Sequence, residues 1–288
     1  MHDERRTGWL LAAVGMLLVS TDSFFIRLSE ADGVDMAFLV AVFSLPAYFV
    51  SNRLLEPISI PAAIRREPKP LAMIGVLAGV SQLSFIVAVT ETAVSNVVVI
   101  VASTPILAAV IAWIALGEKV SMRVWVAIGA TVVGVLIVVS GSIGSPNVKG
   151  DLLAVAAIAA FSVSVVVWRR HADASRFAGL ALSSTVIVVC TAPFVSPFAA
   201  GFRVYACAAA MGLAFNTAGR IAHSTAPRYA PAAEVALFTP VETVAATAWA
   251  WIAFGEQPQA ATMLGGVVVI CGVLYGTVVK QAQPARTG

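Results

Sequence analysis

Charged residues, cysteine and histidine are all scarce in this sequence. Only 11% of the 288 residues are charged, and there are three cysteines and three histidines. Cys190, Cys207 and Cys271 all lie inside apolar runs, so a disulfide framework or a metal site is not expected. The chain contains no His-Glu-x-x-His or Gly-x-Ser-x-Gly motif, and no histidine falls at the middle of a predicted helix, because His223 is terminal. These absences argue against an enzyme.

Hydrophobic side chains are present in excess. They make up 59% of the residues, and the mean hydropathy is +0.92. A soluble domain of this length could not bury that much apolar surface under a polar shell. Runs of roughly 17 to 25 apolar residues are candidates for membrane-spanning helices. Ten such ranges follow one another: 9–28, 35–53, 71–90, 94–116, 123–141, 151–168, 177–197, 204–223, 232–254 and 260–280. We therefore expect an all-α integral membrane protein with ten transmembrane helices, of which the first is retained and not a cleaved signal peptide.

The chain repeats itself at nearly half its length. Ala112–Glu118 reads Ala-Trp-Ile-Ala-Leu-Gly-Glu, and Ala250–Glu256 matches it at six of seven positions with an offset of 138 residues. Self-similarity at a fixed period indicates a duplicated unit. The sequence therefore predicts two five-helix repeats, residues 8–142 and residues 150–281, joined by a turn-forming linker at 141–147.

Basic residues predict the orientation of the chain in the membrane. If the N-terminus is cytoplasmic, only Arg27, Lys149 and Arg203 of the 18 basic residues fall outside. The other 15 fall on the inner side: Arg5, Arg6, Arg53, Arg65, Arg66, Lys69, Lys119, Arg123, Arg169, Arg170, Arg176, Arg220, Arg228, Lys280 and Arg286. Both termini are then cytoplasmic, in the cell inner membrane. Because five helices is an odd number, the second repeat is inverted relative to the first, which is a recurring plan in transporters.

The duplicated pattern resembles the EamA-type branch of the drug/metabolite transporter (DMT) superfamily. In both repeats an apolar fourth helix ends in Gly-Glu, at Gly117-Glu118 and Gly255-Glu256, and a glycine-containing fifth helix follows. The resemblance covers residues 8–281 and implies an alternating-access exporter without a cofactor. Its partners would be a small-molecule substrate and the lipid bilayer, not nucleic acid; proton coupling and a monomer or homodimer remain open. The overall sequence is also similar to exporters of aromatic amino acids, threonine or methionine. One departure is Ser20–Ser23, where many relatives carry a Trp-Gly-Ser/Asn pattern.

Ionisable residues at membrane depth are costly and are functional candidates. Glu242 lies near the middle of the ninth predicted helix and shares one face with Phe238 and Glu234. The repeat pairs Glu234 with Asn96 and Glu242 with Thr104, the second pair at the depth of the membrane centre. Glu242 is either a partner for a substrate ammonium group, a proton-coupling carboxylate or a neutral structural acid. Glu234 is either an interfacial residue or part of an inner gate.

Further polar or aromatic residues within helices are expected to line the cavity or to bond neighbouring helices: Gln82, Asn216, Asp22, Ser164 and Trp168. Asp22 could line an outward vestibule or pair with Arg27, and Trp168 could belong to an interfacial aromatic belt. Pro105 and Pro240 interrupt the fourth and ninth helices and are either hinges or static kinks.

No lysine or arginine is expected at the middle of a helix, so a substrate carboxylate would have to bind backbone or side-chain amides. The Gly-Glu turns are expected to be structural, with each glutamate accepting hydrogen bonds from the free amides of the next helix. The resulting hypothesis is the export of amino acids or similar small metabolites. A multidrug or cation exporter is the alternative, because carboxylates without buried bases suit it.

Overall fold

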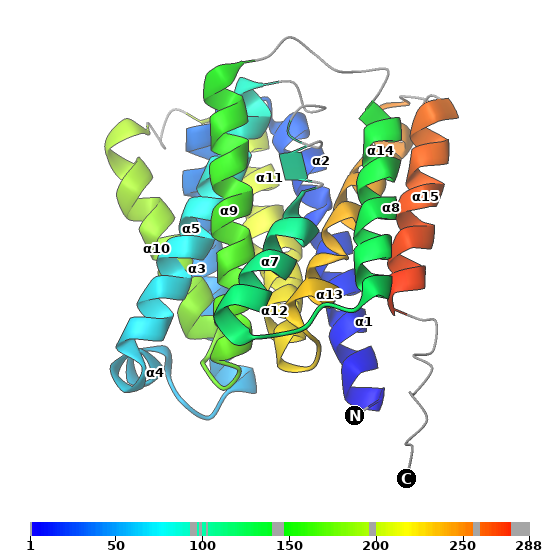
Figure 1. Ribbon diagram of the computed structural model, residues 1–288. Helices are drawn as coiled ribbons and strands as arrows, with labels where there is room; N and C mark the ends of the chain where they lie inside the picture. Colours follow the sequence, from blue (N-terminus) through cyan, green and yellow to red (C-terminus); the bar gives the residue numbers. More distant parts are fainter. Residues whose placement is uncertain are drawn as a thin grey trace.

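The computed structural model describes residues 2–92, 97, 100–101, 103–139, 147–195, 200–255 and 260–277. These residues form helices joined by short connections (Figure 1). The α-helices are α1 (His2–Val19), α2 (Thr21–Ser29), α3 (Gly33–Leu55), α4 (Ile60–Arg66), α5 (Pro68–Glu91), α7 (Thr104–Leu116), α8 (Met122–Val139), α9 (Val148–Arg170), α10 (Arg176–Thr191), α11 (Phe202–Ala210), α12 (Asn216–Thr225), α13 (Ala232–Ala236), α14 (Thr239–Phe254) and α15 (Ala260–Thr277). Short 3₁₀ or π segments are η1 (Ala192–Phe194), η3 (Met211–Phe215) and η4 (Ala226–Arg228).

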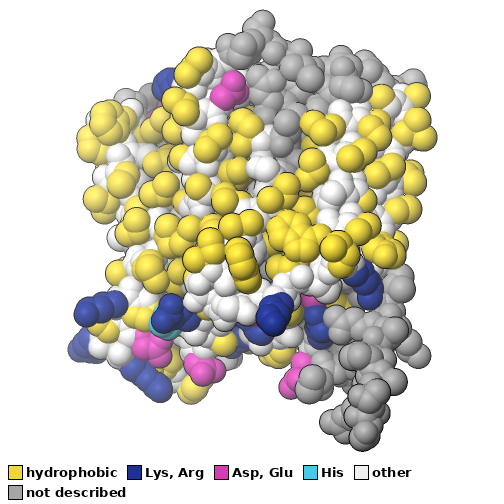
Figure 2. Space-filling model, in the orientation of Figure 1, with side chains coloured by type: hydrophobic (Ala, Val, Ile, Leu, Met, Phe, Trp, Pro, Cys, Tyr) yellow, Lys and Arg dark blue, Asp and Glu magenta, His cyan; other side chains and the backbone are white. Residues whose placement is uncertain are grey.

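The fold is that of a multi-pass membrane protein. Each of the ten predicted ranges overlaps helical residues, and within the described part of the chain six stretches are long and apolar enough to cross a membrane. They are Glu4–Ser29, Gly33–Leu55, Pro68–Glu91, Val148–Arg170, Arg176–Phe194 and Ala232–Ala253. Figure 2 shows a broad hydrophobic band across the visible face of the bundle, with lysine and arginine gathered mainly at one end.

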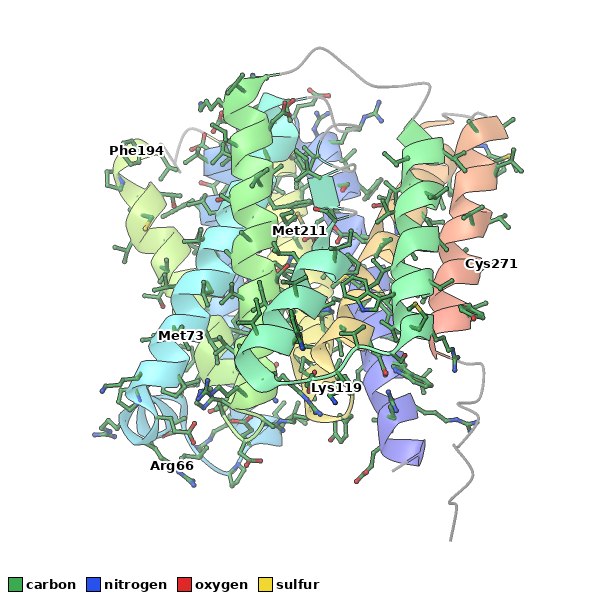
Figure 3. The ribbon with its side chains drawn as sticks, in the orientation of Figure 1. Arg66, Met73, Lys119, Phe194, Met211 and Cys271 are labelled. Atoms are coloured by element: carbon green, nitrogen blue, oxygen red, sulfur yellow. The ribbon has the colours of Figure 1, made fainter. Side chains whose placement is uncertain are left out.

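We call that end the basic end. It is the end where α1 begins and α15 stops, and it carries Arg66 and Lys119, whereas Phe194 lies at the opposite end (Figures 1 and 3).

Several predicted helices are interrupted. The range 9–28 is divided into α1 and α2 at Ser20, and the range 232–254 is divided into α13 and α14 immediately before Thr239-Pro240. Proline has no amide hydrogen and its ring crowds the preceding turn, so it begins a helix more readily than it continues one. Pro105 likewise lies in the first turn of α7. Both prolines therefore mark helix starts, and the segment 54–70, expected as a connection, contains the short helix α4.

The two Gly-Glu turns end helices as expected. Gly117 and Gly255 have φ values of 66° and 69°, the left-handed conformation that glycine adopts without steric cost. Glu118 was expected to accept hydrogen bonds from the free amides of the next helix, α8, and this prediction is wrong. Its carboxylate instead accepts a hydrogen bond from the amide of Ala232 at the start of α13. It also pairs with the Arg169 guanidinium at 2.8 Å, since a charge-assisted bond is stronger than one to an amide. Glu256 lies outside the described residues.

Glycines allow close packing inside the bundle. A Cβ atom added at Gly75 of α5 would lie 2.6 Å from Cβ of Leu182 in α10. One added at Gly134 of α8 would lie 2.8 Å from the carbonyl oxygen of Gly265 in α15. Small residues let helices approach where lipid provides no hydrophobic driving force between them.

The Gly75→Ala variant is therefore expected to destabilise the protein by roughly 1–3 kcal/mol, because α5 and α10 must separate to admit the methyl group. The measurement is unfolding of the purified protein in detergent. Gly129→Ala is the matched control, since nothing lies within 4 Å of a Cβ atom added there. Equal stability of the two variants would contradict the packing described.

Candidate functional site

A cavity of about 130 Å³ lies inside the bundle, between α1, α2, α5, α7, α9, α10, α12 and α14. An engineered cavity of about 150 Å³ in another protein holds benzene, so this one is the size of a small solute. Its walls are largely apolar and include Met16, Phe85, Ile158, Phe161 and Leu180. Among the described residues, no group of three or more histidine, cysteine, aspartate or glutamate residues is placed to hold a metal ion.

The cavity brings together seven of the residues singled out from the sequence: Asp22, Gln82, Thr104, Ser164, Trp168, Asn216 and Glu242. Phe238 lies in a neighbouring hydrophobic cluster with Met16 and Val235, and does not line the cavity. Glu234 lies at the basic end, away from the cavity lining. Asn96 is outside the described residues.

A relay of hydrogen bonds runs along one wall. Arg220 donates to Oε1 of Gln82, whose amide nitrogen donates to Oδ1 of Asn216 at 3.3 Å. The Asn216 amide in turn donates to Oδ2 of Asp22. The two amides therefore connect the guanidinium to the carboxylate. In such a chain each hydrogen bond polarises the next, so that the bonds strengthen one another. Asp22 thus lines the cavity, as predicted, and its carboxylate is bonded to Asn216 of α12.

Arg220 overturns the expectation that no basic side chain reaches the cavity. Its position near the end of the predicted helix 204–223 had assigned it to the inner surface. In the structure the π turn η3 precedes α12, and an extra residue in a turn rotates the following helix by roughly 100°. Met211, at the start of that turn, lies inside the bundle (Figure 3). Arg220 consequently points inward, where its second terminal nitrogen donates to Ser183 at 3.2 Å.

His223 lies in the last turn of α12, as expected, but its place in the cavity wall was not predicted. It is only 6% exposed, lies in α12 one turn beyond Arg220 and lines the cavity. Its ring lies 5.2 Å from that of Phe161, and its Nε2 atom has no hydrogen-bond partner. The same π turn accounts for this position, because it changes which face of α12 points inward.

Trp168 does not belong to an interfacial belt. Its side chain is 3% exposed, and the Arg176 guanidinium lies 4.5 Å from the centre of its ring. Trp168 differs from a belt tryptophan because it is packed among α5, α9 and α10. The absence of a side chain at Gly179 of α10 makes room for its ring. Ser164, four residues earlier, is 4% exposed and faces the same cavity.

Glu242 is a carboxyl group that the protein leaves without a partner. It lies in the first turn of α14 and lines the cavity. No hydrogen bond or ion pair joins it to another described residue. Four further polar atoms on the cavity wall are buried and have no partner: Oδ1 of Asp22, Oγ1 of Thr104, Nε2 of His223 and Oγ1 of Thr239. Thr239 was missed, although the dipeptide Thr-Pro begins both α7 and α14 and could have revealed it.

Ion pairs link the two halves of the chain at the basic end. Glu234 in α13 accepts hydrogen bonds from Arg5 and from the Trp9 indole, both in α1. Arg169 at the end of α9 pairs with Glu118 after α7 and donates to the carbonyl of Pro227. These contacts join α1, α7, α9 and α13 below the cavity, which favours the gate interpretation of Glu234.

Comparison with known proteins gives a family match over the first half. Residues 6–140 match the model of the EamA-like transporter family. A crystal structure of a protein with 16% sequence identity is similar to this fold with a TM-score of 0.79, covering 94% of this chain and 96% of that chain. No curated protein matches the sequence. Neither similarity identifies a substrate.

The relay gives a testable consequence for stability. Arg220→Met is expected to lower the free energy of unfolding by about 1–3 kcal/mol, because Gln82 and Ser183 lose their donor and Asp22 loses the nearest cation. Unfolding in detergent measures the effect, and Arg53→Met, at an exposed position, is the control. An unchanged or increased stability of Arg220→Met would show that the relay does not stabilise the fold.

Proposed function

We propose that this membrane transporter, whose residues 6–140 match the EamA-like transporter family, exports amino acids or similar small metabolites by alternating access. The observation that carries the proposal is the cavity itself. It holds one guanidinium, Arg220, and two carboxylates, Asp22 and Glu242, within largely apolar walls. A zwitterion with an apolar side chain matches each of these features.

The assignment of charges follows from the relay. Arg220 and Asp22 are connected through two amides, so each offsets the other. Glu242 is left without a partner and is the natural contact for an ammonium group. The apolar walls formed by Phe85, Phe161 and Leu180 then accept the substrate side chain.

A multidrug or cation exporter is less well supported than it was by the sequence. That alternative depended on a cavity with carboxylates and no base, and Arg220 lies in this cavity. A permanent cation would meet Glu242 but would be repelled by the guanidinium. Cationic compounds nevertheless form one arm of the test below.

Two inverted five-helix repeats, with ten transmembrane helices, would provide the alternating access. The arrangement in Figure 1 supports this proposal, because α1 begins at the basic end and α9, the first helix of the second half, begins at the opposite end. The excess of lysine and arginine at the basic end supports a cytoplasmic location for that end and for both termini. In this arrangement the breaks before Thr104-Pro105 and Thr239-Pro240 act as hinges.

The substrate class can be tested by counterflow in proteoliposomes. Wild-type protein is expected to exchange L-methionine, L-threonine or L-phenylalanine in preference to a quaternary ammonium compound. Glu242→Gln is expected to reduce exchange of the preferred amino acid by about ten-fold, since a charged hydrogen-bond partner for the ammonium group is lost.

Glu91→Gln is the control, because Glu91 pairs with Lys149 at the end opposite the basic end. Faster exchange of the cation than of every amino acid would overturn the amino-acid assignment in favour of the alternative. Unchanged amino-acid exchange by Glu242→Gln would remove Glu242 from the site.

The gate can be tested by reversing one ion pair. Arg5→Glu places two carboxylates together, and the loss of about 1 kcal/mol from a partly exposed pair is expected to open the basic end about five-fold more often. The reporter is Ser224→Cys, on the cavity wall, in a chain whose three cysteines are replaced by alanine. Its labelling by an impermeant thiol reagent should accelerate in Arg5→Glu and return to the original rate in Arg5→Glu/Glu234→Arg. Equal labelling of all three proteins would show that this pair does not close the basic end.

A further inference from the structure

The helices α7 and α14 begin in the same way. Each starts with Thr-Pro in its first turn, after a residue with nearly identical backbone angles: Ser103 (φ −81°, ψ −8°) and Phe238 (φ −81°, ψ −12°). Neither start has a side-chain cap. The structural counterpart of Thr104 is therefore Thr239, three residues before the Glu242 that the 138-residue offset pairs with it.

Thr104 and Thr239 both line the cavity, and the hydroxyl group of each is buried without a partner. Thr104 is 1% exposed and Thr239 is 4% exposed, and neither Oγ1 atom makes a hydrogen bond. This is unusual here, because other helical hydroxyls bond back to a carbonyl of their own helix. Thr90, Thr131, Thr185, Thr191 and Ser183 all do so. Ser44 and Ser184 also lack partners, but neither lines the cavity.

The two helix starts differ in charge. The first turn of α7 has no acidic residue, so its partial positive charge is not offset by a side chain of that turn. The first turn of α14 carries Glu242, which gives that start a negative character. A threonine hydroxyl can both donate and accept, so the same residue type suits either sign of ligand charge.

Arg220 already uses three of its five N–H donors inside the protein. Its two terminal nitrogens donate to Gln82, Ser183 and the carbonyl of Ala78. The Thr104 hydroxyl, in contrast, has no partner and belongs to a cavity residue at a helix start without acidic residues. Discontinuous membrane helices in transporters commonly direct such starts at anionic substrate groups.

We propose that the two Thr-Pro breaks fix the orientation of a bound zwitterion. Thr104 and the start of α7 hold its carboxylate, while Thr239 and Glu242 at the start of α14 hold its ammonium group. This proposal rests on the amino-acid function proposed above, and it adds the direction in which the substrate lies.

The test uses purified full-length protein and sets of probes that each lack one charge. For methionine these are L-methionine, L-methioninamide without the carboxylate, and 4-(methylthio)butanoate without the ammonium group; threonine and phenylalanine sets follow the same design. Thr104→Val is expected to weaken binding of the two carboxylate-bearing probes about ten-fold and to leave the amide unchanged. Thr239→Val is expected to weaken binding of the two ammonium-bearing probes and to leave the affinity for the butanoate unchanged.

Thr104→Ser and Thr239→Ser keep the hydroxyl and should restore binding, which separates loss of a bond from loss of folding. Ser184→Ala removes a buried, unpartnered hydroxyl outside the cavity and should change none of the affinities. Equal weakening of all probes by either valine variant, or weakening by neither, would overturn the proposed orientation. If only the carboxylates without an ammonium group bind, and Thr104→Val weakens them, the α7 subsite stands and the amino-acid function falls. If no probe binds wild-type protein, both proposals fall.

Discussion

A polar group inside a lipid bilayer has no water to bond, so it must find its partner in the protein or in a solute. Most polar side chains of this protein find their partner within the protein. Serine and threonine hydroxyls donate to carbonyl groups of their own helices, and Gln82 donates to Asn216. Among the described residues, nine buried side-chain atoms have no partner, and four of them belong to residues that line one cavity, as does Glu242. A solute with hydrogen-bonding groups at both ends would satisfy them.

The same constraint explains the basic end. Charges that cannot be satisfied at membrane depth gather where water is near, and there they pair across the two halves of the chain. Glu234 joins α13 to α1, and Glu118 joins the end of α7 to α9 and α13. Because each pair remains partly exposed, its contribution to stability is small, and it can break and reform at modest cost. Weak pairs at one end of a tightly packed bundle are suited to a closure that must be reversible.

The sequence predicted the helices well, because hydropathy and glycine-proline punctuation are local properties of the chain. It also singled out Glu242, Asp22, Gln82 and Asn216 as cavity candidates, and all four line the cavity. Arg220 and His223 were missed because the π turn at Met211–Phe215 changes which face of α12 points inward, and no residue pattern announced that turn.

Thr239 was missed for a different reason. The 138-residue offset aligns the Gly-Glu ends of the two helices, whereas their Thr-Pro starts are offset by 135. One sequence alignment cannot match both ends of helices whose lengths differ. The hydrogen bond between Glu118 and Ala232 joins segments that are far apart in the sequence. It depends on the packing of α7 against α13, which local sequence patterns do not predict.

The unequal lengths of α7 and α14 have an electrical consequence. α7 runs 13 residues from its break to its end and α14 runs 16, or about 20 and 24 Å along their axes. Measured along the helix axes, the break before α7 is thus about 4.5 Å closer to the end of its helix than the break before α14 is to its own, and equal tilts of the two helices would place a solute bound at the breaks nearer the membrane face where α7 ends. A charge bound there divides the transmembrane voltage unequally, and the smaller share of the field falls on the side where α7 ends.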